Sequence, residues 1–588
     1  MDRSKITKLL VIPFMLFVGV TFFLNTRFLI GFSPGHNSDY LFLKEMNMNH
    51  EGMEDVKRAM IGGRIEEAKA HFIQYKDNNL FSNPSPLVAA SDLTVADDIL
   101  NHYFVYQDAG YFAGENIEWD ALPSTDKEWT WFLNRHYWAS DLARAYLATS
   151  DEKYAREFVS LFLDFYHDQP YGTSNSLCWR QKDTTRRVRN HLDAYEVFMN
   201  SEAFTTDAKF KWYKFIWEQA YFLSHDPEKK GNGAIMCVTA LLRCKVAFPE
   251  MKDAPYWELK AWSIAKEVTR NQLLPDGVHD ELSTHYHNVV VDEHLDYFEL
   301  LLANDLEIDD YMYSRVEDAL NFTMDTHTVT GKTMTFNDAD ACDDTNLLER
   351  GAVIYNRSDF LYIATSGVNG TPPIYNNKAY KDAGFFLMRS GRGFNSTFLM
   401  FDGGPPGTSH IHHDLLSFAL DAFGTNLLLD PGRGTYDESQ PERNYLRSSR
   451  AHNLFMLDGI PLEGAIPDLA KWYNAPTAAF ASATHSFWGD SVSRHILYPS
   501  NGRDYYVILD KVHGGTHLVE NQFHFHDPAV LATNNNHSFE STTASTGYIK
   551  SYCAQTWNDT IMLVNSTNPM GGIYSPTYNN YQPATTVI

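Results

Sequence analysis

The chain has 588 residues and a formal charge of −26 at neutral pH, because 74 acidic residues outnumber 48 basic ones. Its length predicts two or three domains, and a composition with 44% hydrophobic and 21% charged residues is typical of a globular protein. The acidic balance argues against nucleic acid as the natural partner, although a locally basic cleft can still bind an anionic polymer.

Residues 1–34 have the pattern of a targeting segment. Arg3, Lys5 and Lys8 precede an apolar run over residues 9–24, as in a secretory signal peptide or a signal anchor. No A-x-A cleavage site follows, which favours an anchor, although the run is short for a full span of about 20 residues. We therefore expect a secreted, periplasmic or cell-surface protein whose contact with a membrane is through this segment alone.

Residues 40–330 have the spacing of amphipathic helices. Within residues 135–168, apolar side chains recur at intervals of three and four, and residues 149–151 break the pattern, which predicts a helix, a turn and a second helix. Repeated antiparallel helix pairs of this length predict an all-α solenoid or toroid. Further helices are expected near residues 183–200, 207–225, 232–248, 256–270, 288–304 and 313–326.

After residue 378 the apolar pattern changes to a period of two. Segments such as AGFFLMRSG, STFLMFDGG and RDYYVILDKVHGG are bounded by Gly, Asp and Asn, which predicts an antiparallel β-sandwich over residues 378–588. Residues 331–377 contain clusters of Gly, Asn, Pro and Asp and are expected to be a linker. The last residues, IYSPTYNNYQPATTVI, are loop-like, and we expect more sheet to follow in a longer protein.

A histidine cluster, TSHIHHD, precedes two of these apolar segments. On a strand, His410 and His412 would point to the same face and His413 to the other. Asp430 ends the next apolar segment, and His452 begins another. Two histidines and one aspartate from neighbouring strands predict a zinc site. The alternative is a set of hydrogen-bonded histidines without a metal.

Two segments of the helical half contain candidate catalytic groups. PDGVHDELSTHYH, residues 275–287, includes Tyr286, which could act as an acid or base if nearby cations lower its pKa. The alternative is an amphipathic tyrosine at a helix start. Asn232 lies at a glycine-flanked helix start and is either an N-cap or a neutral donor that binds a carboxylate.

Basic residues are concentrated in WRQKDTTRRVRNHLDAY, residues 179–195, and Arg135 lies upstream of it. In an acidic protein, such an island suits an anionic polymer, although a solvated helix face gives the same pattern. The arginines within the island are Arg180, Arg186, Arg187 and Arg189.

The chain resembles the heparinase II/III-like polysaccharide lyases, a group that includes heparin and heparan sulfate lyases and some alginate lyases. The resemblance lies in LNRHYW, WRQKDTTRRVR, LLPDGVHDELSTHYH, HIHHDLLSFALDAFGTNLLLDPG and RSSRAHNLFMLDG, and covers about residues 100–580. It implies an incomplete (α/α) toroid followed by an antiparallel β-sandwich, with the cleft between them. It also implies β-elimination at a uronic acid, so the expected partner is an anionic polysaccharide that contains uronate.

The resemblance also implies roles for the candidate residues. Tyr286 and His410 would be catalytic, and Asn232 would neutralise the uronate carboxylate. His412, Asp430 and His452 would match the ligands of a structural zinc ion. The residues that we expect to bind substrate are Trp179, Arg135, Arg187, Tyr436 and Arg450.

One position departs from the family pattern. Many members have Asn-His where this chain has Asn232-Gly233, which removes one candidate neutralising or base group. Two other functions remain open on the sequence. One is a membrane-anchored glycan-binding or capsule-assembly protein without turnover. The other is a glycoside hydrolase, which needs two carboxylates that flank the bond; Asp280 and Glu281 are adjacent, so at most one is expected to face a site.

Overall fold

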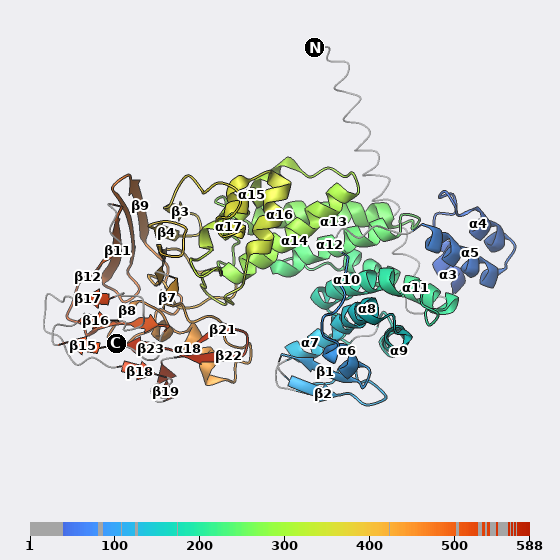
Figure 1. Cartoon of the computed structure of the whole chain (residues 1–588), viewed down its shortest axis with the longest axis horizontal. Coiled ribbons are helices and arrows are strands. Elements are labelled where there is room, and N and C mark those ends of the chain that lie inside the picture. The colour runs from blue at the N-terminus through green and yellow to red at the C-terminus, as the bar shows by residue number, and fades with distance from the viewer. Residues whose placement is uncertain are drawn as a thin grey trace, which may run out of the picture.

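The chain folds into a helical half followed by a half built of antiparallel sheets, and the two lie next to each other along the longest axis (Figure 1). This confirms the predicted fold class. The computed structural model describes residues 39–588, except residues 80–85, 108, 124–126, 173–174, 423, 501–504, 527–531, 535–537, 541–547, 551–561, 565, 568–569 and 572. The predicted targeting segment, residues 1–34, lies outside the described residues. No helix within them is both long enough and apolar enough to cross a bilayer.

The helices follow one another from the start of the described chain to residue 364. They are α3 (Asp39–Lys44), α4 (Glu54–Ile61), α5 (Ile65–Asn78), α6 (Thr94–Ile99), α7 (Glu128–Asn134), α8 (Tyr137–Thr149), α9 (Glu152–Asp168), α10 (Gln181–Phe198), α11 (Thr206–His225), α12 (Gly231–Ala247), α13 (Ala254–Gln272), α14 (Thr284–Ala303), α15 (Asp310–Thr326), α16 (Thr345–Tyr355) and α17 (Ser358–Ala364). A hairpin of β1 (Tyr103–Tyr106) and β2 (Ala109–Phe112) interrupts them.

From α8 onward the helices pack in two rows. Helices α8, α10, α12, α14 and α16 contact one another in that order, and α9, α11, α13 and α15 form the second row. Side-chain caps define several helix starts: Asp151 accepts a hydrogen bond from the backbone of Lys153 at α9, and Ser283 accepts one from that of Tyr286 at α14. This alternation between two layers is the arrangement expected of an (α/α) toroid.

The second half contains two large antiparallel sheets. Eight strands run in the order β18-β23-β14-β7-β6-β5-β4-β3, and four in the order β12-β11-β10-β9. The strands from residue 378 are β3 (Lys378–Tyr380), β4 (Phe385–Arg389), β5 (Thr397–Asp402), β6 (Phe418–Ala422), β7 (Thr425–Leu428), β8 (Phe455–Leu457), β9 (Leu469–Ala475), β10 (Ala478–His485), β11 (Ser491–Pro499), β12 (Val507–His513), β13 (Val519–Asn521), β14 (Phe523–Phe525), β15 (Ala532–Asn534), β16 (Ser538–Glu540), β17 (Tyr548–Lys550), β18 (Met562–Val564), β19 (Ser566–Thr567), β20 (Met570–Gly571), β21 (Ile573–Thr577), β22 (Asn580–Pro583) and β23 (Thr585–Val587), with α18 (Pro441–Arg447) and a 3-10 turn (Ser449–Ala451) before β8.

The central strands of the eight-stranded sheet are buried on both faces. On β4, Phe386 and Met388 join the core that the four-stranded sheet completes, whereas Phe385 and Leu387 join a second core. That second core includes Val278 and other side chains of the helical half. Alternate residues of one strand therefore hold both halves of the protein together, and the segments around this junction form the candidate site.

Two expectations about the chain between and after the halves need correction. The sequence predicts a linker over residues 331–377, but α16 and α17 lie within this range, because Leu348 and Phe360 are buried in the core of the helical half. The C-terminal sequence, expected to be a loop, forms strands β21 to β23, and β23 pairs with both β14 and β18.

Candidate active site

The histidine-rich segment is a loop at the junction of the two halves. The sequence predicts that His410 and His412 share a strand, but residues 408–417 contain none. His410 has a left-handed backbone with φ of 57°, which no strand accommodates. The loop is held by a neighbouring segment: Asn337 Oδ1 accepts the backbone N–H of His412 at 2.8 Å, and the backbone N–H of Asp338 donates to the carbonyl of His410 at 3.2 Å.

The carboxylate of Asp338 joins both histidine rings. Its Oδ2 lies 3.0 Å from Nδ1 of His410, and its Oδ1 lies 2.9 Å from Nε2 of His412. Burial alone would raise the pKa of Asp338, but hydrogen bonds from His410, His412 and Arg443 hold this pKa well below its usual range. An ionised carboxylate only accepts hydrogen bonds. We therefore assign the proton of neutral His410 to Nδ1 and that of His412 to Nε2, which leaves lone pairs on His410 Nε2 and His412 Nδ1.

Tyr286, in the first turn of α14, lies against the ring of His410. The two rings stack with centroids 3.8 Å apart and planes inclined by 16°. The hydroxyls of Tyr286 and Tyr436 are hydrogen bonded to each other. Arg433 Nη1 donates to the hydroxyl oxygens of Tyr286 at 3.2 Å and Tyr436 at 3.3 Å. Two phenols, one imidazole and one guanidinium therefore meet at one point.

The protonation of Tyr286 follows from this environment. Burial raises the pKa of Tyr286 to about 12, although Arg433 and the hydrogen bond with Tyr436 oppose the rise. The lowered pKa considered from the sequence is therefore not found in the free protein. At neutral pH, Tyr286 carries its proton and can act as an acid. If it loses the proton, Arg433 is placed to stabilise the phenolate.

Asn232 lies on the other helix start that the sequence predicted to be functional. The N-cap of α12 is Lys230, and Asn232 is inside the first turn, so the N-cap interpretation of Asn232 is wrong. Its side chain is buried, and no hydrogen bond from its amide to another described residue is found. A Cβ on the preceding Gly231 would lie 3.0 Å from Glu281 Oε1, and Glu281 Oε2 lies 3.8 Å from His410 Nε2. The start of α12, which carries Asn232, therefore lies close to Glu281, and Glu281 faces His410.

The three predicted zinc ligands come together. One donor atom from each of His412, Asp430 and His452 lies within 4.8 Å of the other two, and all three side chains are buried. The unprotonated Nδ1 of His412 has no hydrogen-bond partner among the described residues, and Asp414 adds a second buried carboxylate beside the group. Burial raises the pKa of Asp430 to about 7. A divalent cation would satisfy these groups, so the residues fit a nitrogen- and oxygen-ligated metal such as zinc.

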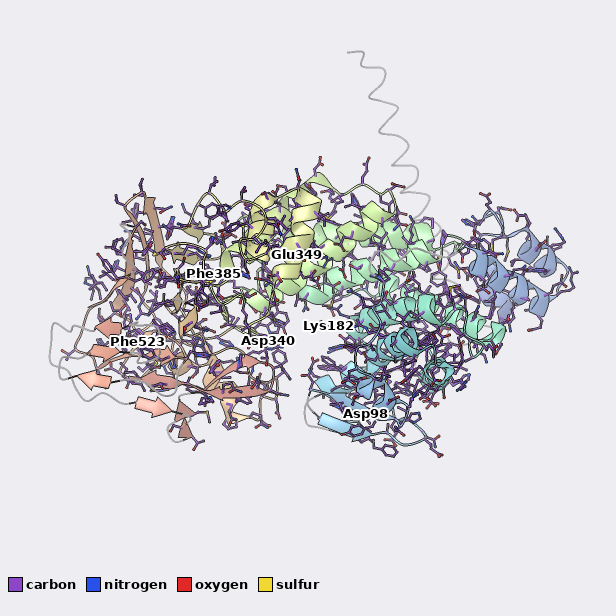
Figure 2. All side chains as sticks on the ribbon, in the orientation of Figure 1. Asp98, Lys182, Asp340, Glu349, Phe385 and Phe523 are labelled. Carbon is purple, nitrogen blue, oxygen red and sulfur yellow. The ribbon has the colours of Figure 1, made fainter. Side chains whose placement is uncertain are left out.

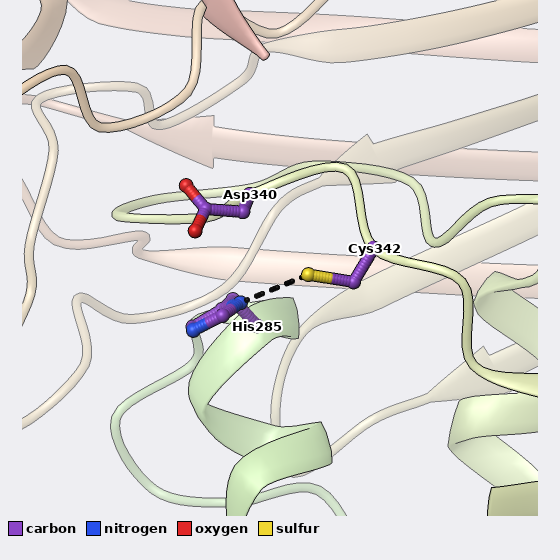
Figure 3. A group of neighbouring side chains, drawn as sticks. All are labelled: His285, Asp340 and Cys342. Carbon is purple, nitrogen blue, oxygen red and sulfur yellow. Dashed lines mark hydrogen bonds between the residues drawn. The ribbon is translucent and has the colours of Figure 1, made fainter. Parts of the chain in front are cut away.

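A second group of side chains of the types that can bind a metal lies beside Tyr286. His285 Nδ1 is 3.5 Å from Cys342 Sγ, and Asp340 completes a set of donor atoms within 4.8 Å of one another (Figure 3). Both carboxylate oxygens of Asp340 already bond Arg433. A cation here would compete with that guanidinium, so we assign Asp340 to the positioning of Arg433.

Comparison with known proteins identifies the family. The Heparinase II/III N-terminus model matches residues 42–359, and the Heparinase II/III-like C-terminal model matches residues 373–588. The chain belongs to the heparinase II/III family. It is 29% identical over 497 residues to a heparin-sulfate lyase of Pedobacter heparinus, and the matched region covers 80% of this chain and 75% of the relative. A heparin-sulfate lyase of Bacteroides stercoris is 24% identical over 511 residues, with coverage of 80% and 76%.

Solved structures agree with this heparinase II/III assignment at the level of the fold. The crystal structure of a heparinase III superimposes with a TM-score of 0.84 at 20% identity, covering 94% of this chain and 90% of that one. The sequence relatives support the predicted enzyme class, a polysaccharide lyase.

Two of the arginines that were predicted to bind substrate in this heparinase II/III protein, Arg187 and Arg135, instead bind other residues of the protein. Arg187 is fully buried and donates to Gln219, Thr184 and two backbone carbonyls. Its placement contradicts the expected contact with a polymer, because the helix packing encloses the guanidinium. Arg135 is bound by Asp183 and Glu128, at 2.9 and 3.0 Å, which neutralise its charge.

The other three predicted substrate-binding residues lie in different places. Tyr436 is within the Tyr286 cluster and lies 3.3 Å from His410 Nδ1 through its hydroxyl. Trp179 is half-buried among aromatic side chains and donates to the carbonyl of Gln169 at 3.1 Å. Arg450 contacts Glu520 and the carbonyl of Gly459, so its contacts are with the sheets rather than with Tyr286.

Sequence reasoning did not single out Asp338, Arg433 or Arg443, although all three build the site. Asp338 lies in the acidic stretch FNDADACDD, within the expected linker. The sequence does not distinguish Asp338 there from the other acids, of which Asp340 and Asp344 are also buried and Asp343 is exposed. Arg433, in DPGRGTY, is three residues before Tyr436. Its closeness in sequence to a predicted substrate-binding residue is the signal that could have identified it.

We expect Asp338→Asn to reduce kcat by roughly 10²–10⁴-fold, because an amide fixes neither histidine tautomer as a carboxylate does. Loss of the charge that pairs with Arg443 should also destabilise the fold, by about 3–5 kcal/mol, and metal affinity should fall about 10–100-fold. Kinetics, chemical denaturation and metal analysis check the three effects. Asp421→Asn, which alters a buried aspartate of β6, is the matched control. Equal effects of the two variants would contradict the role of Asp338.

Proposed function

We propose that this heparinase II/III protein cleaves a uronate-containing glycosaminoglycan, of the heparan sulfate type, by β-elimination. The observation that carries the proposal is the cluster of Tyr286, His410, Tyr436 and Arg433, in which an acid, a base and a cation share one point at the junction of the halves. The heparin-sulfate lyases among its relatives support the choice of polymer.

The chemistry requires one proton acceptor and one proton donor. The acceptor removes the proton from C5 of the uronate, and the electron pair forms a double bond between C4 and C5. The bond between C4 and O4 breaks with its electrons on O4, which takes a proton from the donor. Tyr286 is protonated in the free protein and serves as the donor. His410 Nε2 has the free lone pair and is the acceptor when the C5 proton lies on the opposite face.

When C5–H and O4 lie on one face of the sugar, Tyr286 acts as both base and acid. This requires a phenolate in the complex, which Arg433 stabilises at 3.2 Å. The uronate carboxylate becomes enolate-like as the C5 proton leaves, and the amide of Asn232 donates a hydrogen bond to it. Free donor capacity at Asn232 is consistent with this role.

The metal site acts on the loop rather than on the substrate. His412, Asp430 and His452 would hold the ion, which we propose to be zinc. A bound cation would supply a rigid anchor for the loop between His410 and β6. Asp338 bonds the other nitrogen of His412, as a carboxylate commonly does for a metal-bound imidazole.

A glycoside hydrolase is less well supported. It needs two carboxylates that flank the scissile bond. Of the neighbouring acids Asp280 and Glu281, Glu281 faces His410. The carboxylate of Asp338 is also close, but it is bonded to Arg443, His410 and His412. No second free carboxylate is found close to Tyr286 among the described residues.

Product analysis tests the proposed function. We expect heparan sulfate, offered in a panel with chondroitin sulfate and alginate, to give products with the ultraviolet absorbance of an unsaturated uronate. In water enriched in oxygen-18, a lyase incorporates no label at the cleaved linkage, whereas a hydrolase incorporates one oxygen. Labelled saturated products would establish the hydrolase, and an intact polymer with measurable affinity would establish a binding protein.

A further inference from the structure

Lys182, in the first turn of α10, lies beside Gly233, the residue that follows Asn232. A Cβ at Gly233 would lie 3.3 Å from Cε of Lys182 and 2.8 Å from Cγ of Glu228. The lysine stem therefore fills space that a side chain at position 233 would need. Figure 2 shows Lys182 at the edge of the helical half that is next to Asp340.

The ammonium of Lys182 has no carboxylate in direct contact among the described residues, and Glu128 and Glu281 act on it only at a distance. It is half-buried, yet it forms no hydrogen bond or ion pair with any residue in the described part of the chain. The neighbouring arginines Arg135 and Arg180, in contrast, form ion pairs. Asp183 binds Arg180 and Arg135, at 2.8 and 2.9 Å, and Glu128 also binds Arg135, at 3.0 Å.

An unpaired charge of this kind is costly in the free protein. Withdrawing an ammonium from water without a direct partner is unfavourable. Burial lowers the pKa of Lys182, Arg135 and Arg180 act in the same direction, and Glu128 and Glu281 oppose them only in part. An anionic ligand would remove the cost. Asn232 directly precedes Gly233, and its unpaired amide is a second group that can donate a hydrogen bond to such an anion.

We propose that Lys182 binds the uronate carboxylate together with Asn232 and supplies the positive charge for its neutralisation. This inference rests on the proposed function and deepens it. An amide offers hydrogen bonds but no net charge, so Asn232 alone stabilises an enolate-like dianion weakly. An ammonium is a compact charge on a flexible stem, and its attraction grows as negative charge develops on the carboxylate, so it acts mainly on kcat.

Lys182→Met keeps the stem and removes the charge. On native heparan sulfate we expect kcat to fall at least about 100-fold, with a smaller change in KM, and Lys182→Arg to recover part of the loss. On the same polymer with its uronates methyl-esterified, the carboxyl is already neutral, and the Met variant should match wild type within a few-fold.

Lys230→Met removes an exposed lysine near Asn232 and controls for general electrostatics; it should leave kcat unchanged.

A binding measurement separates this inference from the proposed function. In a Tyr286→Phe background, the protein should bind heparan sulfate oligosaccharides more tightly than their carboxyl-reduced counterparts, and Lys182→Met should reduce that preference. This result stands even if the wild-type protein cleaves nothing. The inference is overturned if Lys182→Met retains the full wild-type preference for carboxylate, or if it loses equal activity on native and esterified polymer.

Discussion

Tyr286→Phe is expected to lower kcat about a thousandfold, within the roughly 10²–10⁴-fold range of a lost acid or base. The substitution removes the hydroxyl that bonds Tyr436 and accepts from Arg433 at 3.2 Å, but keeps the ring that stacks on His410. KM should change little, because the hydroxyl acts in the transition state rather than in binding. Steady-state formation of unsaturated product measures the effect.

Tyr297→Phe is the matched control for this variant. Tyr297 lies on the same helix, α14, and is similarly buried, but it is not part of the His410 cluster. The control should keep wild-type kcat, and both variants should keep wild-type thermal unfolding. If Tyr286→Phe retained full activity, Tyr286 would be neither the acid nor the base.

His452→Ala is expected to have the second large effect, on stability. The change removes one of the three candidate metal ligands and leaves Asp430 buried without its partner at 2.9 Å. We expect the free energy of unfolding to fall by about 3–5 kcal/mol, and the metal content of the purified protein to fall with it. Chemical denaturation and elemental analysis measure the two changes.

His485→Ala serves as the control because His485, on β10, is equally buried but lies outside the triad. It should keep its metal. A chelator should lower the stability of the wild-type protein towards that of His452→Ala and leave His452→Ala itself unchanged. A wild-type protein purified without any metal, and insensitive to the chelator, would contradict the metal assignment.

The long elements were predictable from the sequence because each buries its side chains with one period. Helices α10 to α15 begin within four residues of their predicted starts, since their apolar stripes are long enough to define them. The ribbon of β9, β10 and β11 was not singled out, because most side chains of β9 are exposed and give no apolar alternation. Likewise, α16 was missed because acidic and small residues surround its two buried leucines.

The candidate site was predictable where residue type alone suggests chemistry, as for Tyr286, His410 and the metal triad. The contacts that organise it were not. His410 and His412 meet through Asp338, which is 72 and 74 residues away in the chain, and no local pattern encodes such a pairing. Arg187 illustrates the opposite error, since an arginine on a helix has the same local pattern whether it faces a cleft or the interior.

The doubly covered sheet limits how this protein can be divided. The two family models meet between residues 359 and 373, which suggests a natural cutting point. However, Phe385, Leu387, Phe398 and Met400 of the sheet share a core with Val278 and Phe322 of the helical half. A C-terminal fragment produced alone would present this apolar face to water and aggregate. A helical fragment would keep Asp338 but lose the loop with His410 and His412 and all three candidate metal ligands. The two halves are modules in sequence but a single unit in folding.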